Sequence, residues 1–204
     1  MMQTGASAAK RVLPTKSPTS EIMNLTNPEK LILVMLSEIH AGLKIKDGID
    51  PDLVASAIQS GNTWGISWQY GMLLDGGDAT PDHVNLCTEI LSMWSDIESS
   101  FEQLTPEEKE KVRAEAAPFS PGFGGFDGNE ESSYLSAARF LVDNLGRFGN
   151  FKGRRLDGGV HTLPAHRRML TTHSAIREGY SPGPLNAAQI TRLLASQRWQ
   201  AAKS

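Results

Sequence analysis

Apolar residues recur at intervals of three and four along most of the chain, and this spacing predicts helices. The longest such stretch covers residues 80–103, and its apolar face is formed by Val84, Cys87, Leu91, Trp94, Ile97 and Phe101. No segment alternates between apolar and polar positions in the manner of a strand. We therefore expect an all-α, multihelical single domain of about seven or eight helices over residues 25–204.

Two apolar patterns predict parts of the core. Residues 31–36 are apolar on every side, which predicts a helix buried on several sides. Trp64, Trp68 and Met72 lie four residues apart and predict a buried ridge. Gly65 interrupts this ridge and would let another helix approach closely.

Residues 1–24 have a different composition from the rest. They are rich in Ala, Ser, Thr and Pro, they carry Lys10, Arg11 and Lys16, and they contain no acidic residue before Glu21. Such a segment cannot bury enough apolar surface to fold, so we expect a disordered leader. The alternative is a short basic arm that contacts anions.

An aromatic and glycine-rich loop precedes the best-marked helix. Phe123 and Phe126 alternate with glycines in residues 121–128, which predicts a loop held to the core by its aromatic rings. Asp127 or Asn129 is expected to cap the helix that follows.

That helix is predicted over residues 130–147. Tyr134 belongs to its apolar face, and Arg139, Asp143 and Arg147 lie four residues apart beside it, so they could form a ladder of ion pairs. Two interpretations remain open: a structural helix with a solvated charge ladder, or a polar pocket containing Asp127, Arg139 and Arg147, with walls of Phe123, Phe126 and Tyr134.

The central stretch resembles the YfbU family. The resemblance is carried by Gly125-Phe126-Asp127, Glu131, Tyr134-Leu135, Arg139-Phe140, Val142, Gly146-Arg147 and Phe151. Leu25-Thr26-Asn27, Leu31-Ile32-Leu33, Arg168-Met169-Leu170 and Leu185-Asn186-Ala187 extend it over residues 24–196. It implies an all-helical bacterial or archaeal domain with no agreed catalytic residues. Some members carry the domain beside a DNA-binding helix-turn-helix, which implies a regulatory, ligand-sensing role. The leader and the segment 152–159 depart from the family pattern.

The net charge of −3 conceals an imbalance along the chain. Residues 1–138 hold 9 basic and 20 acidic residues, a net charge of −11, whereas residues 139–204 hold 11 basic and 3 acidic residues, a net charge of +8. The basic part could contact nucleic acid or another anion. Alternatively, the two parts pack together and their charges offset each other.

A basic cluster follows the central helix. Arg154, Arg155 and His161 precede Pro164, and Arg167 and Arg168 follow it, with His166 between. Phosphate binding is the functional interpretation, and a flexible insert with ordinary surface arginines is the other. The full set of candidate ligand-binding residues is Phe123, Phe126, Asp127, Tyr134, Arg139, Arg147, Arg154 and Arg168.

Several chemistries find no support in the sequence. The histidine spacing matches no zinc motif, the glycine loop lacks the Lys-Ser/Thr of a phosphate-binding loop, and Cys87 lies on an apolar stripe. We expect no cofactor or metal and no catalytic residue. One cysteine and the absence of a long apolar run favour a cytoplasmic protein that does not cross a membrane.

Three functions remain open. The first is a non-enzymatic, possibly regulatory homo-oligomer that binds a small anionic ligand or a protein partner. The second is a regulator that contacts nucleic acid through its basic C-terminal third, which we do not favour. The third is an enzyme acting on a phosphorylated substrate through Arg139, Arg147, Arg154 or His166, which requires these side chains to meet in one cavity.

Overall fold

Helices account for all the regular structure in the part of the chain that the computed structural model describes, residues 25–46, 48–74, 79–179 and 183–198. The predicted all-α fold is confirmed, and the expected disordered leader lies outside the described residues. The elements are α1 (Asn27–Gly42), α2 (Pro51–Ser60), α3 (Trp64–Tyr70), α4 (Asp82–Glu102), α5 (Pro106–Ala116), α6 (Ser132–Arg139), η1 (Phe140–Asn144), η2 (Gly149–Phe151), α7 (Leu163–Glu178) and α8 (Ala187–Ala195).

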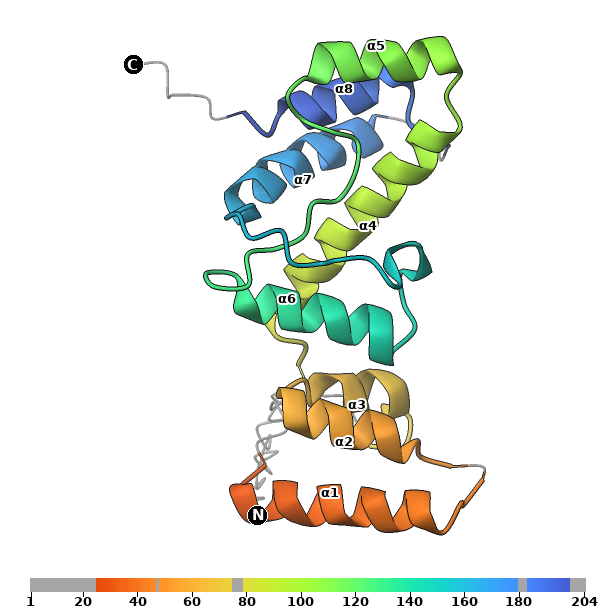
Figure 1. The fold of residues 1–204 in the computed structure, drawn as a ribbon, viewed down its shortest axis with the longest axis vertical. Coiled ribbons are helices and arrows are strands. Elements are labelled where there is room, and N and C mark those ends of the chain that lie inside the picture. Colours follow the sequence, from red (N-terminus) through yellow and green to blue (C-terminus); the bar gives the residue numbers. More distant parts are fainter. Residues whose placement is uncertain (1–24, 47, 75–78, 180–182, 199–204) are drawn as a thin grey trace, which may run out of the picture.

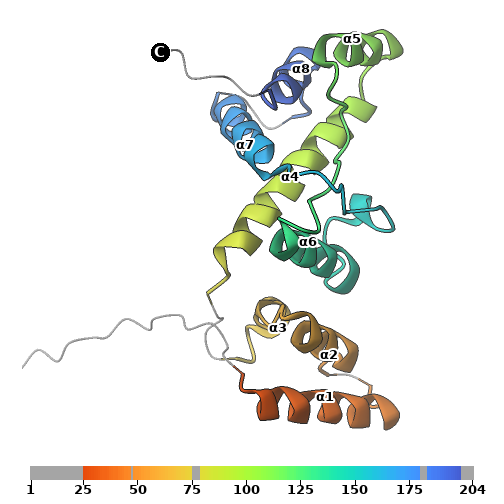
Figure 2. The ribbon, with the colours of Figure 1, turned by 60° about the vertical axis from the view of Figure 1, so that its left-hand side comes forward.

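The molecule is elongated, and α4 runs obliquely through its larger part (Figure 1). Helices α7 and α8 pack beside one half of α4, with α5 against α8, while α6 packs beside the other half. Helices α1, α2 and α3 form the opposite end of the molecule, beyond α6 (Figure 2). The central position of α4 follows from its sequence, because nine of its residues are buried: Val84, Cys87, Ile90, Leu91, Met93, Trp94, Ile97, Ser100 and Phe101.

Several helix starts carry capping motifs that are visible in the sequence. Thr105 and Glu108 form a reciprocal capping box at the start of α5, and Asn186 and Gln189 form another at the start of α8. The prediction for the central helix was wrong, since α6 begins at Ser132 and neither Asp127 nor Asn129 caps it. The Asp127 carboxylate instead accepts a hydrogen bond from the Asn129 amide at 2.8 Å, which closes a tight turn within the loop.

Helix α1 is less buried than its sequence predicts. Leu33 and Val34 are partly buried and Ser37 is buried, whereas five other apolar side chains of the helix are more than half exposed: Leu31, Ile32, Met35, Leu36 and Ile39. The physical reason is that α1 packs chiefly against α2, which covers only one side of it. A helix that is apolar on every side therefore presents half of its surface to solvent.

The predicted tryptophan ridge is only partly correct. Trp64 is buried and Trp68 half-buried, with ring centroids 5.2 Å apart, but Met72 is fully exposed. Helix α3 ends at Tyr70, so position 72 does not continue the helical face. The close approach expected at Gly65 is confirmed, because a Cβ atom there would lie 2.2 Å from Cε1 of Phe140.

The central helix changes its geometry after Arg139. Residues Phe140–Asn144 form a π-helical turn, in which the Leu145 amide donates to the Phe140 carbonyl five residues earlier. The predicted ladder of Arg139, Asp143 and Arg147 does not form among the described residues, and Arg147 lies beyond the end of this turn at Asn144. The guanidinium of Arg147 instead lies over the ring of Trp68, 5.0 Å from its centroid.

Candidate functional site

The glycine-rich loop is bonded to the segment after the central helix. The Phe126 amide donates to the Leu156 carbonyl at 2.9 Å, and the Gly158 amide donates to the Phe126 carbonyl at 2.8 Å. Gly125 has φ +93°, and a Cβ atom there would lie 2.4 Å from the Leu156 carbonyl oxygen. Only glycine tolerates both conditions. The interpretation of residues 152–159 as a flexible insert is therefore wrong for the part that makes these bonds.

Glu131 connects this loop to the start of α7. Its carboxylate is 1% exposed and accepts hydrogen bonds from the backbone amides of Asp127 and Thr162, both at 2.9 Å, and of Leu163 at 2.5 Å. The Thr162 hydroxyl donates to it at 3.1 Å, and Nδ1 of His161 lies 3.0 Å away. The first amides of α7 have no hydrogen-bond partner within the helix, and the Glu131 carboxylate accepts from them. The helix dipole also favours the negative charge of this carboxylate at the start of α7.

Beneath Glu131, His166 is enclosed by aromatic rings. Trp94, Phe123 and Phe126 have ring centroids 5.6–6.0 Å from its imidazole. Burial lowers the pKa of His166 from 6.5 to about 4, although the nearby charge of Glu131 acts in the opposite direction. His166 is therefore neutral at pH 7, and it is a core residue rather than a phosphate ligand.

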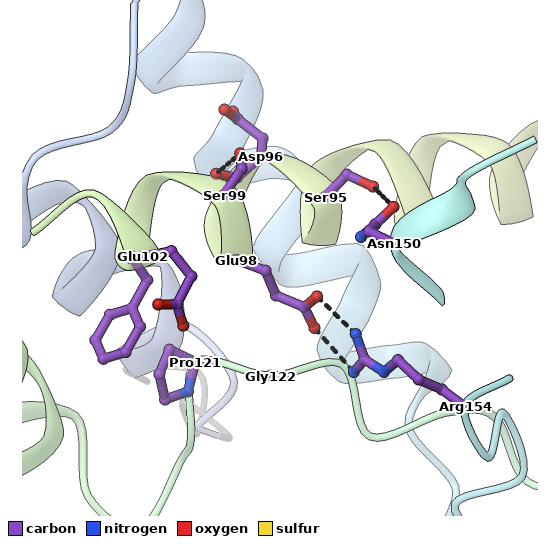
Figure 3. Close-up of a pocket in the computed structure, with 10 residues that line it drawn as sticks. Ser95, Asp96, Glu98, Ser99, Glu102, Pro121, Gly122, Asn150 and Arg154 are labelled. Atoms are coloured by element: carbon purple, nitrogen blue, oxygen red, sulfur yellow. Dashed lines mark hydrogen bonds and ion pairs between the residues drawn. The ribbon is translucent and has the colours of Figure 1, made fainter. Parts of the chain in front are cut away.

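A hollow lies along α4 and is shown in Figure 3. It has a volume of about 700 Å³ and an apolar floor that includes Phe101 and Pro121. Arg154 reaches across it and forms a two-pronged ion pair with Glu98, with nitrogen–oxygen distances of 2.7 and 3.0 Å. The Glu98 carboxylate also accepts from the Phe123 amide at 2.7 Å, so this ion pair holds the aromatic loop against α4.

The remaining carboxylates that line this hollow along α4 (the α4 groove) are also paired. Asp96 accepts hydrogen bonds from Arg177 and lies 2.7 Å from Nε2 of His173. Burial alone would raise the pKa of Asp96, but these two partners outweigh it and hold the pKa below its ordinary value. Glu102 pairs with Lys109 at 3.1 Å. The groove therefore presents no unpaired charge among its described lining residues, and Arg154 has a structural role within it.

Two of these ion pairs join the acidic part of the chain to the basic part. Arg154 and Arg177 of the basic C-terminal part pair with Glu98 and Asp96 of the acidic part. These contacts pair two cations of the basic part with two carboxylates of the acidic part, as expected if the two parts pack together and offset each other's charge.

The predicted ligand-binding residues occupy several separate settings. Phe123, Phe126 and Tyr134 do come together, with ring centroids 5.4 Å and 5.8 Å apart in successive pairs, but they form core packing rather than the wall of an open pocket. Asp127 is buried in the loop turn.

The four arginines of the predicted set do not share a cavity. Arg147 lies over Trp68, Arg154 pairs with Glu98, and Arg168 donates to the carbonyls of Ser196 and Gln197 after α8. Arg139 lines a separate hollow between α2 and α6. The basic cluster in the sequence is therefore not a cluster in space, and the side chains invoked for a phosphorylated-substrate enzyme do not meet.

An apolar surface covers the end of the molecule formed by α1, α2 and α3. Eleven of the twelve exposed large hydrophobic residues in the described part of the chain lie there: Leu31, Ile32, Met35, Leu36, Ile39, Leu43, Ile45, Ile49, Met72, Leu73 and Leu74. The twelfth is Val160. A hollow of about 320 Å³ between the three helices is lined mainly by apolar side chains, including Leu33, Val54 and Ile66.

Sequence reasoning did not identify the roles of Glu131, Glu98 and Asp96. Glu131 was noticeable only as an acidic residue beside the Gly-Phe-Asp turn, since its partners at 161–163 are some thirty residues away. No local pattern distinguishes Glu98 or Asp96 from the other acids of α4, because their partners are 56 and 81 residues away along the chain.

Among the described residues, no three or more His, Cys, Asp and Glu side chains are grouped so as to hold a metal ion. The described helices include none that is long and apolar enough to cross a membrane.

The family model of the YfbU domain matches residues 23–195. Comparison with curated proteins gave no match.

Proposed function

This chain belongs to the YfbU domain family, and we propose that it is a non-enzymatic domain that self-associates. The surface of self-association is the apolar surface at the end of the molecule formed by α1, α2 and α3. The observation that carries the proposal is the concentration of eleven exposed large hydrophobic residues at one end of the molecule. Large exposed apolar patches are rare on monomeric proteins and mark interaction sites.

A second copy of the same chain is the occupant that fits this surface best. If each half-exposed side chain contributes on the order of 100 Å², the eleven residues together offer roughly 1,000 Å², compared with about 800 Å² per partner in a stable interface. Ile32, Leu36 and Ile39 of α1, and Leu43 directly after it, are exposed and follow each other at intervals of four, three and four. Such a stripe can pack against its own two-fold copy, since the same surface then serves both partners.

The proposal is tested by measuring molecular mass by sedimentation velocity over a range of protein concentrations. The wild-type chain should sediment as a dimer or larger assembly, and a variant carrying both Ile32→Glu and Ile39→Glu should be monomeric, because each carboxylate would be buried without a partner. Val160→Glu is the matched control, since Val160 is similarly exposed but lies outside the surface, and it should leave the assembly unchanged.

Two outcomes would overturn this proposal. One is a wild-type chain that remains monomeric at the highest concentration measured. The other is a monomeric full chain that associates only after residues 1–24 are deleted, which would mean that the chain's own N-terminal segment covers the apolar surface.

Nucleic-acid binding gains no support from the arrangement of the basic residues. Arg154 and Arg177 pair with carboxylates, and Arg168 and Arg198 donate to backbone carbonyls. The charges of Arg154 and Arg177 are offset by their carboxylate partners, so these two side chains are not available to neutralise phosphates. The single cysteine favours the cytoplasm, which we propose as the compartment of the protein. We also propose that self-association serves a regulatory role.

A further inference from the structure

The hollow between α2 and α6 differs from the α4 groove in its charge. It has a volume of about 350 Å³ and is lined by Ser60, Asn62, Ser132, Ser136, Arg139 and Asn144, together with Gly128 and two apolar side chains. No carboxylate belongs to this lining. Its size is at the lower end of the range for small-molecule sites, which bind ligands through a few convergent polar groups.

Arg139 is the only charged residue in this lining, and no described side chain pairs with it. Its natural partner in a regular helix would be Asp143, four residues later. No ion pair joins these two side chains among the described residues, and the helix changes to π-helical geometry at Phe140, between them. Turns of this kind are found frequently at functional sites. The guanidinium, with donors suited to an oxyanion, therefore remains available in the hollow.

The wall opposite Arg139 is held in place by a buried amide. Asn62 is 4% exposed, and its side-chain oxygen accepts from Nε1 of Trp64 at 3.1 Å. Its side-chain nitrogen donates to the hydroxyls of Ser60 at 2.9 Å and Ser136 at 3.0 Å. This network joins α2, α3 and α6 and fixes the hydroxyls that line the hollow.

The directions of these hydrogen bonds leave the hydroxyl proton of Ser136 without an acceptor in the described part of the chain. The Ser60 hydroxyl donates to the Ser56 carbonyl, so its proton is used. The Ser136 hydroxyl accepts from Asn62, and no acceptor within the described residues takes its proton. Ser132 and Asn144 add a second hydroxyl and an amide to the same lining. The hollow thus combines one permanent positive charge with several neutral donors, which is the chemistry that binds a phosphate group.

We propose that the hollow between α2 and α6 binds the phosphate group of a small phosphorylated metabolite, with Arg139 as its charged ligand and Ser136 as a hydrogen-bond donor. This site is separate from the apolar surface proposed for self-association. Its ligand would contact α2 and α6 together, and thereby link the α1–α3 end to the larger part of the molecule.

The test is a titration of the full-length, ¹⁵N-labelled protein with inorganic phosphate, followed by amide chemical shifts in NMR spectra. Ionic strength is kept constant with sodium chloride, and acetate is titrated separately. Phosphate should give saturable shifts at residues 60–62 and 132–139, and Arg139→Gln should weaken binding at least tenfold. Ser136→Ala should weaken it by a smaller factor.

Arg167→Gln is the matched control, because Arg167 is an exposed arginine on α7 that does not line this hollow. It should leave the phosphate titration unchanged. The proposal is overturned if phosphate shifts do not saturate, if Arg139→Gln binds as the wild type does, or if acetate binds as tightly as phosphate. Spectra of the unliganded variants confirm that each remains folded, so that loss of binding is not loss of structure.

Discussion

Single carboxylates decide how the loops of this protein attach to its helices. Glu131 accepts hydrogen bonds from amides on both sides of the contact between the Gly-Phe-Asp turn and α7, and Glu98 joins the aromatic loop to Arg154. Hydrogen bonds to a charged acceptor contribute more than neutral ones, and leaving buried amide donors without a partner is costly. Glu131 is the residue at which the most such bonds converge.

Replacing Glu131 with Gln should therefore lower the free energy of unfolding by about 2–3 kcal/mol, because the neutral side chain keeps the shape but loses the charge and one acceptor. Urea denaturation followed by circular dichroism measures the change. Glu130→Gln is the control, since the Glu130 side chain is 69% exposed, and it should have little effect. Equal effects of the two substitutions would contradict this account of Glu131.

At the scale of the element, sequence patterns predicted which helices form better than they predicted what covers them. Residue spacing predicted α4 correctly, and the capping boxes at the starts of α5 and α8 can be read directly from the sequence, because these signals act within a few residues of the chain. The burial of α1 was predicted wrongly, since the apolar pattern gives the preference of a helix for a partner and not the number of partners the chain supplies.

The candidate site was harder to predict than the helices. The sequence placed Arg139, Arg147, Arg154 and Arg168 in one set because they follow each other along the chain, whereas the fold separates them. Arg139 ends α6 and lines one hollow, whereas Arg147 follows the π-helical turn and lies over Trp68, and no local sequence signal predicted that turn.

Helix α3 depends on the glycine that allows it to approach η1. A Cβ atom at Gly65 would lie 2.2 Å from Cε1 of the buried Phe140 ring, which cannot move freely. Gly65→Ala should therefore lower the free energy of unfolding by about 1–3 kcal/mol despite alanine's better helix propensity. Gly42→Ala, in the last turn of α1, meets no atom within 4 Å, and it should be neutral or slightly stabilising in the same urea experiment. If Gly65→Ala is also neutral, the packing of α3 against Phe140 is not as described.

For the whole molecule, the buried histidine makes stability depend on pH. The pKa of His166 is about 4 in the fold and near 6.5 when the chain is unfolded. Between these values the unfolded chain binds more protons, so the contribution of His166 is complete above pH 6.5 and is lost as the pH falls towards 4.

The free energy of unfolding should consequently fall by about 2 kcal/mol between pH 7 and pH 5 on account of His166 alone. Urea denaturation at a series of pH values measures this slope. His166→Leu removes the titrating group and suits the aromatic surroundings, so its slope over the same range should be shallower by about that amount. A slope identical to that of the wild type would show that His166 is not buried in its neutral form.

The uneven cover of the helices has a consequence for motion. Helix α4 contacts α6, α7 and α8, whereas α1 rests chiefly on α2. Opening α1 would disrupt few interactions within the chain, so its amide hydrogens can exchange with solvent through local fluctuations, while those of α4 exchange only when the entire fold comes apart. A partner copy seated on α1 would slow that exchange, and the first helix would then be as well protected as the centre of the molecule.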